Sequence, residues 1–200
     1  MITERDRKII NFIDSVNYAS ISNIASLFFS ESKFSYDLAR KRLNKIKNMG
    51  EYIKSIQNLE TNELIYIPYN SNRKRVSIHD ITVINYACKL YELGCEVKEI
   101  IIQPIFGNII PDAYIRFVYD DYQYQQLVEV QIRHNKPDFE KYKSVDVMNK
   151  ILEKTEETIP TLVLIQDTNI KYEDDELNMD IVQIQTNLRD ASKALTLNIQ

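Results

Sequence analysis

The sequence predicts an α/β protein of the α+β kind, in which a small helical domain precedes a mixed-sheet α/β domain. Three helix-like segments and one hairpin pattern fill the first seventy residues. The rest of the chain alternates helices with short apolar strands. Its 200 residues, 44% hydrophobic and 27% charged, suffice for one good-sized core or two small ones. We expect domains over 1–70 and 77–200, joined by a polar linker over 71–76.

Capping residues and apolar spacing predict the first two helices. Thr3 and Asp6 have the spacing of a helix cap. Apolar residues then recur at helical intervals, at Ile9, Ile10, Ile13 and Val16. A second, shorter helix begins near Ser20 or Ser22, with its own apolar face.

A third helix is predicted from a Ser35 cap to Gly50, where we expect a left-handed residue. At 100° per residue, one side collects the apolar residues that pack on the first two helices, namely Leu38, Ala39, Leu43, Ile46 and Met49. The opposite side is polar and basic. Arg42 falls near the packing side, so we expect its stem to pack and its guanidinium to reach solvent.

A hairpin follows, with strands over 52–56 and 63–67 and a polar turn over 58–62. Three helices followed by a hairpin is the element order of a winged helix-turn-helix, whose third helix enters the DNA major groove. Arg and Asn suit base edges, whereas Lys and Tyr suit phosphates. The candidate DNA contacts are Tyr36, Asp37, Arg40, Lys41, Asn44, Lys47, Lys54, Arg73, Lys74 and Arg75.

The charge distribution agrees with a polyanionic partner for the N-terminal part. Residues 1–80 carry 13 Lys and Arg against 9 Asp and Glu, whereas residues 81–200 carry 12 against 20. A basic module joined to an acidic one favours nucleic-acid binding by the first. Two alternatives remain open: the asymmetry is chance, or the basic helix is a solvated face on a module that binds only protein.

The second domain is predicted as helix, three strands, helix, two strands, helix. Ser77 caps a helix ending at Gly94, and Pro137 opens another with Phe139, Tyr142, Val145, Met148 and Leu152 inward. The strands lie over 97–103, 113–119, 126–132, 161–165 and 180–185. A helix capped by Thr186 ends the domain. The result is a mixed sheet with helices.

Asp112 stands at the start of one predicted strand, and Glu129 lies within the neighbouring strand. Two carboxylates placed in this way are able to hold Mg²⁺ for phosphodiester cleavage. Nuclease chemistry also needs a cation beside the metal, and Gln131 stands at that place without a charge. The alternative is structural: Asp112 caps a strand entrance after Pro111, and Glu129 pairs with Arg116 or Arg133.

Pro111-Asp112 and Glu129-Val130-Gln131, in this order of elements, resemble the core of the PD-(D/E)xK nuclease-like superfamily. Joined to a winged helix, the chain looks most like the replication-relaxation family of plasmid and mobile-element proteins. Two further segments add to the likeness, His79-Asp80-Ile81 and Phe139-Glu140-Lys141-Tyr142-Lys143. The resemblance implies DNA binding in replication, transfer or regulation of a plasmid or phage. Gln131 stands where the superfamily usually has lysine, which argues against cleavage, although some active members of the superfamily have glutamine there.

We therefore expect a sequence-specific, homodimeric binder of double-stranded DNA, whose nuclease-like domain is inactive and serves dimerisation or contact with a replication or transfer protein. The alternative is a Mg²⁺-dependent endonuclease using Asp112, Glu129 and Gln131; otherwise no cofactor is expected. Three glycines are too few for Gly-rich phosphate loops, and two cysteines with two histidines make no zinc site. No apolar run predicts a membrane span or signal peptide, so we expect a cytoplasmic protein.

Overall fold

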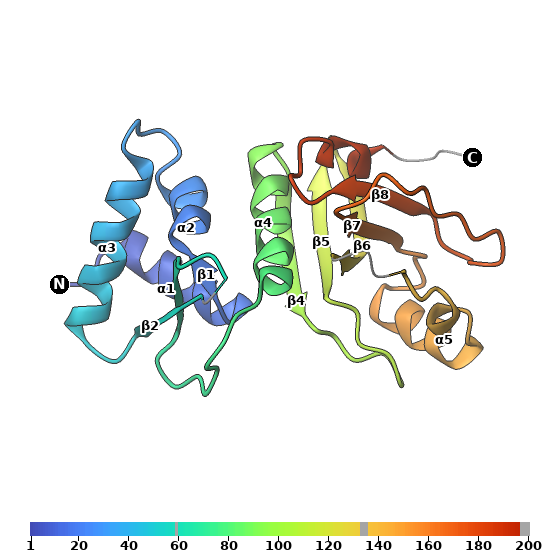
Figure 1. Ribbon diagram of the computed structural model, residues 1–200, viewed down its shortest axis with the longest axis horizontal. Coiled ribbons are helices and arrows are strands. Elements are labelled where there is room, and N and C mark those ends of the chain that lie inside the picture. The colour runs from blue at the N-terminus through green and yellow to red at the C-terminus, as the bar shows by residue number, and fades with distance from the viewer. Residues whose placement is uncertain (59, 133–135, 197–200) are drawn as a thin grey trace. The chain divides into compact units, whose positions relative to one another are not determined.

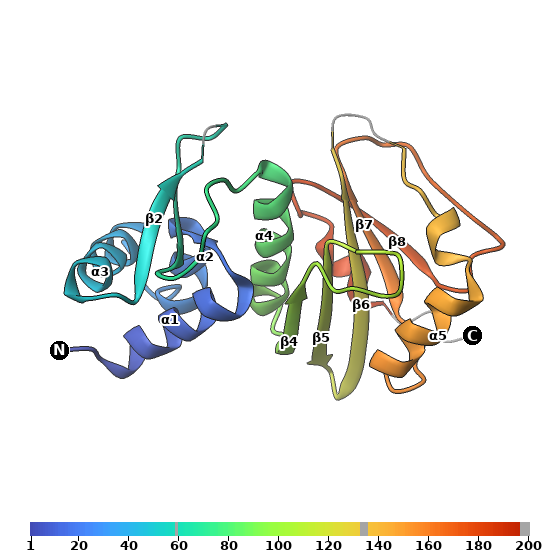
Figure 2. The same cartoon turned by 90° about the horizontal axis from the view of Figure 1, so that it is seen from below.

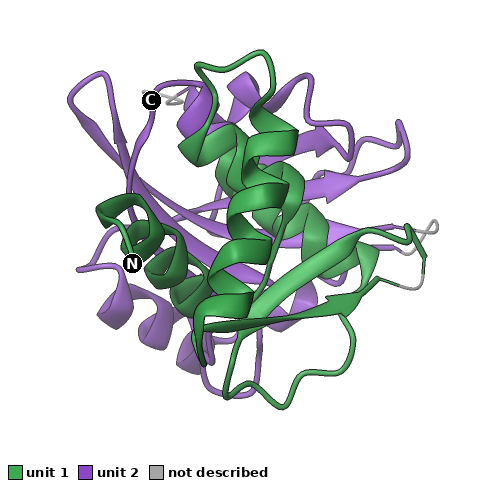
Figure 3. Cartoon of the chain, turned by 90° about the vertical axis from the view of Figure 1, so that its left-hand side faces the viewer, with its two compact units in different colours: residues 1–88 green, residues 89–200 purple. Residues whose placement is uncertain are grey.

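The structure is a computed structural model, and it describes residues 1–58, 60–132 and 136–196. Helices and two sheets alternate along the chain, as expected for an α+β fold (Figure 1). The chain divides into two compact units, residues 1–88 and 89–200 (Figure 3). The division falls inside a helix and not in the segment 71–76.

The first unit combines three helices with a three-stranded antiparallel sheet in the order β1-β3-β2. Its elements are α1 (Glu4–Val16), β1 (Ala19–Ser20), α2 (Ile21–Phe28), α3 (Ser35–Met49), β2 (Ile53–Gln57) and β3 (Leu64–Pro68). Apolar side chains from the helices and the sheet form one core, which includes Ile9, Ile13, Ile24, Leu43, Ile46, Ile53 and Tyr66. The helix pattern and the hairpin are confirmed. The sequence did not predict β1, which is only two residues long.

Reciprocal side-chain caps fix the starts of α1 and α2. Thr3 Oγ1 accepts the Asp6 N–H at 3.3 Å, and the Asp6 carboxylate accepts the Thr3 N–H at 2.6 Å. Ser20 and Asn23 make the same exchange, at 3.1 and 2.9 Å. Each pair satisfies two of the N–H groups that a helix start leaves without partners. Ser20, and not Ser22, therefore begins α2.

Three expectations about α3 are wrong. Phe34 and not Ser35 is the N-cap residue, and its side chain makes no capping hydrogen bond. Leu38, expected among the packing residues, is 40% exposed. Gly50 is extended, with φ 161°, and not left-handed. Glycine suits this position for another reason, because a Cβ would lie 3.1 Å from the Tyr52 ring.

The segment predicted as a linker is held to the first unit. Asn58, buried in the hairpin turn, donates its side-chain amide to the Val76 carbonyl at 2.7 Å. Arg73 lies 3.3 Å from the Asp80 carboxylate and stacks on the Tyr18 ring. Helix α4 (Ile78–Glu92) begins with the expected Ser77 cap, which exchanges hydrogen bonds with Asp80.

The second unit is built on a five-stranded mixed sheet in the order β4-β5-β6-β7-β8 (Figure 2). Its elements are β4 (Glu96–Ile102), β5 (Ala113–Tyr119), β6 (Tyr122–Gln131), the 3₁₀ helix η1 (Glu140–Tyr142), α5 (Val145–Lys154), β7 (Thr161–Gln166), β8 (Ile181–Gln185) and the 3₁₀ helix η2 (Ala191–Leu195). β4, β5 and β6 are antiparallel, whereas β7 and β8 run parallel to β6. The mixed sheet is confirmed, and the predicted strand ends differ from the observed ones by at most four residues.

The central strand β6 is covered on both faces, and alternate residues show what covers it. Gln125 donates to the Thr155 carbonyl at the end of α5, at 2.8 Å, and Leu127 shares a core with Tyr142 and Ile151. On the other face, Gln126 donates to the Ala194 carbonyl in η2, also at 2.8 Å. Helix α5 thus lies on one face of the sheet and η2 on the other.

Two predicted helices are wrong. The helix expected to open at Pro137 is a 3₁₀ turn followed by α5, and the break before α5 changes the helical phase. Val145, expected inside, is therefore 75% exposed, and Val147 and Ile151 are buried in its stead. Thr186 caps no helix, because its N–H extends the sheet by bonding the Gln166 carbonyl at 3.0 Å.

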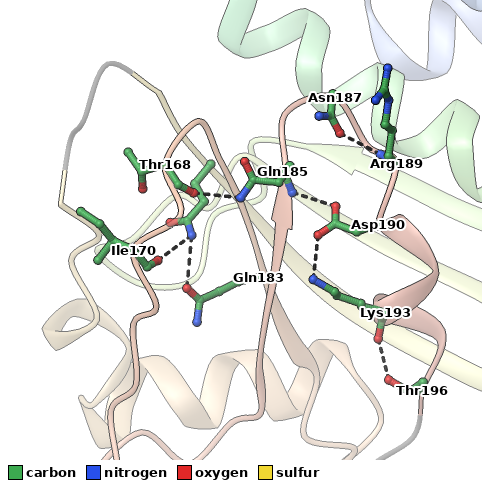
Figure 4. Close-up of polar contacts among 10 residues, drawn as sticks. Thr168, Ile170, Gln183, Gln185, Asn187, Arg189, Asp190, Lys193 and Thr196 are labelled. Atoms are coloured by element: carbon green, nitrogen blue, oxygen red, sulfur yellow. Dashed lines mark hydrogen bonds and ion pairs between the residues drawn. The ribbon is translucent and has the colours of Figure 1, made fainter.

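Glutamine side chains organise the loop that connects β7 to β8 (Figure 4). Gln166 donates to the Ile170 carbonyl at 2.8 Å, and Gln185 donates to the Thr168 carbonyl at 2.9 Å. The backbone N–H of Gln185 is bonded to the Asp190 carboxylate at 2.9 Å. The side-chain amides of Gln166 and Gln185 thus bind loop carbonyls that would otherwise need a strand partner, and they hold the loop against the sheet.

Candidate nucleic-acid interface and carboxylate cluster

Helix α3 presents a basic face to solvent. Its buried residues are Ala39, Leu43 and Ile46, which lie along one stripe. The helix carries five Lys and Arg residues and a single acidic residue, Asp37. Lys41 lies opposite the buried stripe and is exposed, as the spacing predicts.

One of the five cations, Arg42, forms an ion pair inside the first unit and is not part of the exposed basic face. Arg42 forms a bidentate pair with the carboxylate of Asp6, which is 0% exposed, and also donates to Thr3 Oγ1 at 3.0 Å. Burial raises the pKa of Asp6, but the hydrogen bonds from Arg42 and Thr3 outweigh it and hold the pKa at about 2. Arg42 thus fastens α3 to the start of α1. Its place beside the packing side is as expected, but the expectation that its guanidinium reaches solvent is wrong, because the buried Asp6 carboxylate binds it.

Four of the predicted DNA contacts on α3 also bond to residues of the same unit. Arg40 pairs with Asp37 at 3.0 Å, and both side chains are about half exposed. The other two face the β-sheet. Asn44 Oδ1 accepts the Tyr66 hydroxyl at 3.0 Å, and Lys47 Nζ donates to Ser55 Oγ at 3.3 Å.

Lys45 was missed by the sequence reasoning, although its spacing was visible. It lies one turn after Lys41 and is exposed. Together with Arg40 and Lys41 it forms a patch of three cations. This patch, Arg40, Lys41 and Lys45, is here called the α3 basic patch. Tyr36 is 46% exposed at the start of the same helix.

The remaining predicted DNA contacts lie outside α3. Lys54, on β2, is half-buried, whereas Lys74 and Arg75 are exposed in the segment before α4. Arg73 is tied to Asp80 and to the Tyr18 ring, so its guanidinium serves the fold of the first unit.

In the second unit, Asp112 sits where β5 begins beside β6. Its N–H donates to the Val128 carbonyl at 3.0 Å, and its Oδ2 accepts the Val130 N–H at 2.7 Å. Asp112 therefore extends the pairing of the two strands with its own side chain. Gln131 is the last residue of β6, pairs in register with Gln166 and is half-buried.

Glu129 is 7% exposed and points to the α5 face of the sheet. Its Oε1 lies 2.5 Å from Lys141 Nζ and also accepts the Tyr142 hydroxyl. Burial raises the pKa of Glu129, and the neighbouring Asp112 charge adds to this, whereas Lys141 and Tyr142 act in the opposite direction. Tyr142 is buried, and burial beside this carboxylate raises its pKa, so the hydroxyl stays protonated and donates.

The expected pairing of Glu129 with Arg116 is wrong, because Arg116 lies 3.5 Å from Glu99 on the neighbouring strand β4. Arg133, the other expected partner, lies outside the described residues. Lys141, the actual partner, is twelve residues further along the chain in η1. Its sequence position gave no sign of the pairing, which depends on how the chain returns from β6.

One oxygen of each carboxylate, Asp112 and Glu129, is already engaged by a group of the protein. Mg²⁺ prefers several oxygen ligands, usually carboxylates and waters. In the part of the chain that the structure describes, no group of three or more His, Cys, Asp or Glu side chains has an arrangement that could hold a metal ion. Glu129 Oε1 already accepts from Lys141 and Tyr142, and Asp112 Oδ2 from a backbone N–H.

Comparisons with known proteins found no match to a protein-family model, a curated protein or a solved structure. Among the described residues, no helix combines the length and apolar character needed to cross a lipid bilayer.

Proposed function

We propose that this chain is a sequence-specific DNA-binding protein of a plasmid or phage, acting in the cytoplasm in transcriptional regulation, replication control or DNA transfer. The observation that carries the proposal is the α3 basic patch, three exposed cations on the solvent face of one helix. The only acidic residue of that helix, Asp37, is paired with Arg40.

Double-stranded DNA is the partner that fits a helix of this kind. The major groove admits one α-helix, and Lys and Arg on its outer side neutralise phosphates and release counterions. The order α1-β1-α2-α3-β2-β3, with the hairpin beside α3, supports a winged helix-turn-helix. In such a domain α3 enters the groove and the β2–β3 hairpin lies over the adjoining backbone.

The second unit has a separate role in this proposal. A nuclease-like sheet whose carboxylates are engaged by protein groups does not cut DNA but offers a surface for dimerisation or for a replication or transfer protein. A homodimer places two copies of α3 on a palindromic site. The dimer then binds more tightly than one copy, because both helices contact the same DNA. The sequence resemblance to replication-relaxation proteins supports the same role.

The test is a salt titration of DNA affinity by fluorescence anisotropy, with fragments taken from around the gene. The double variant Lys41→Ala/Lys45→Ala loses two phosphate contacts, so the slope of log affinity against log salt should fall by about 2. Lys8→Ala is the matched control, because Lys8 is an exposed lysine on α1 of the same unit, paired with Glu4. An unchanged slope in the double variant, or no salt-sensitive binding by the wild type, contradicts the proposal.

A second candidate, a Mg²⁺-dependent endonuclease using Asp112, Glu129 and Gln131, gains one observation. Lys141 Nζ lies beside Glu129 and supplies the positive charge that Gln131 lacks. Supercoiled DNA incubated with the protein in Mg²⁺ or in EDTA separates the two functions. Cutting only in Mg²⁺, abolished by Asp112→Ala, supports the endonuclease, whereas intact DNA in both buffers supports the regulator.

A further inference from the structure

The Lys141 ammonium is held between the Glu129 carboxylate and the Tyr142 ring. Its Nζ lies 2.5 Å from Glu129 Oε1 and 5.2 Å from the centre of the Tyr142 ring. The Lys141 side chain is 27% exposed, whereas Glu129 and Tyr142 are buried. A carboxylate on one side and an aromatic face on the other are both favourable to an ammonium group.

The same contacts leave no room for a second cation on this oxygen. A carboxylate oxygen offers two lone-pair directions, and on Glu129 Oε1 they are used by the Lys141 ammonium and the Tyr142 hydroxyl. Mg²⁺ approaches its oxygen ligands to about 2.1 Å and demands near-octahedral geometry. Binding through this oxygen therefore requires that Lys141 leave, because Tyr142 is enclosed by the core of the second unit.

Asp112 is also engaged. Its Oδ2 is bound at 2.7 Å to the Val130 N–H, a contact that is part of the β5–β6 pairing. Turning this carboxylate toward a metal ion exposes an unpaired N–H at the strand junction, which is costly. Both carboxylates that the sequence pattern assigns to a metal thus balance groups of the protein itself.

We propose that the Lys141 ammonium takes the place of a divalent cation at the Glu129 carboxylate, beside Asp112, so that the wild-type second unit binds Mg²⁺ there only weakly. This inference rests on the proposed function in one respect, namely that the second unit does not cut DNA. Lys141 is then the group that balances the Glu129 charge and blocks its Oε1, and its removal creates a metal site.

The experiment measures Mn²⁺ binding to the full chain by the loss of the free Mn²⁺ signal in electron paramagnetic resonance. Mn²⁺ accepts the same oxygen ligands as Mg²⁺. Lys141→Met keeps the stem without the charge, and Lys141→Arg keeps the charge. Lys150→Met is the control, because Lys150 is a partly exposed lysine of α5 that pairs with Asp146 and not with Glu129. Circular dichroism checks that each variant is folded.

We expect Lys141→Met to bind Mn²⁺ about tenfold more tightly than the wild type, within the 10–100-fold by which groups beside metal ligands change affinity. Lys141→Arg and Lys150→Met should bind as weakly as the wild type. Adding Glu129→Gln to Lys141→Met should remove the gain. Equal Mn²⁺ affinity of wild type and folded Lys141→Met overturns the inference.

The wild type alone also tests the inference, whether or not Lys141→Met folds. Tight Mn²⁺ binding that Glu129→Gln abolishes overturns it, and the absence of such binding supports it. DNA affinity in EDTA, measured on the same samples, is a separate readout. If the wild type binds Mn²⁺ at Glu129 but shows the salt-sensitive DNA binding of the α3 basic patch without cutting, this inference fails and the proposed function stands.

Discussion

Replacing Asp6 with Asn should weaken the attachment of α3 to α1 and destabilise the first unit. The Asp6 carboxylate is fully buried, receives both guanidinium bonds of Arg42 and closes the cap with the Thr3 N–H. Asn keeps the volume of the side chain and part of the cap but loses the charge that balances Arg42. A buried charge that loses its partner is the costly case for a buried ion pair.

The size of the effect follows from the pKa of Asp6. A pKa that falls from 3.8 in the unfolded chain to about 2 in the folded one corresponds to about 2 kcal/mol of folding free energy. Because the pKa is lowered, this contribution is complete above the unfolded value and is lost as the pH falls from about 4 to about 2. The loss in Asp6→Asn should therefore be about 2 kcal/mol at neutral pH and should shrink in acid.

Urea unfolding followed by far-ultraviolet circular dichroism gives the free energy, and hydrogen exchange of α1 amides assigns the loss to the first unit. Asp14→Asn is the matched control on the same helix, because burial raises the pKa of Asp14 and its charged form adds nothing to stability. Equal stability of Asp6→Asn and wild type at neutral pH, or a difference that persists undiminished near pH 2, refutes this account of the pair.

Asn23→Ala removes the bond from the Ser20 N–H to the Asn23 side chain, which is one half of the reciprocal cap of α2, and a 2.7 Å hydrogen bond to Asn85, so urea unfolding should show a loss of about 1–2 kcal/mol. Gly94→Ala places a Cβ in open space at a φ of +88°, so the expected loss of about 1 kcal/mol comes from the backbone, and Gly94→Asn should lose less. Burial raises the pKa of Cys95 to about 11, so a thiol reagent near pH 8 should modify it only after unfolding; rapid reaction of the folded chain contradicts this.

Elements that depend on nearby residues were predictable from sequence. The caps at Thr3, Ser20 and Ser77 each join residues three apart, so they form wherever a helix begins. The apolar runs of β5 and β7 predict buried strands because their side chains suit both faces of a covered sheet. These features carry their physical cause within a few residues of chain.

Phase and exposure were not predictable where distant segments decide them. The apolar spacing from Phe139 to Leu152 is compatible with one helix, but the chain breaks before α5 and turns Val145 outward. The N–H of Thr186 bonds to β7 and does not begin a helix, because a parallel partner was available there. In each case a tertiary contact is stronger than the local preference.

In the candidate sites too, some features were predictable from sequence and others depend on tertiary contacts. The spacing of α3 determined that Lys41 faces solvent, because an amphipathic helix has one side to bury. Sequence also placed Asp112 and Glu129 on neighbouring strands. It did not reveal that Arg73 is tied to Asp80 or that Lys141 neutralises Glu129.

The sequence by itself thus determined most of the helices and strands, since local hydrogen bonding and periodic burial act over single turns and strands. Only the tertiary structure decided which charges are available to a partner. Arg42 and Lys141 carry the same formal charge as Lys41, but each is held by a buried carboxylate. That difference arises because ion pairs form between residues far apart in sequence, and their strength depends on burial that only the folded chain provides.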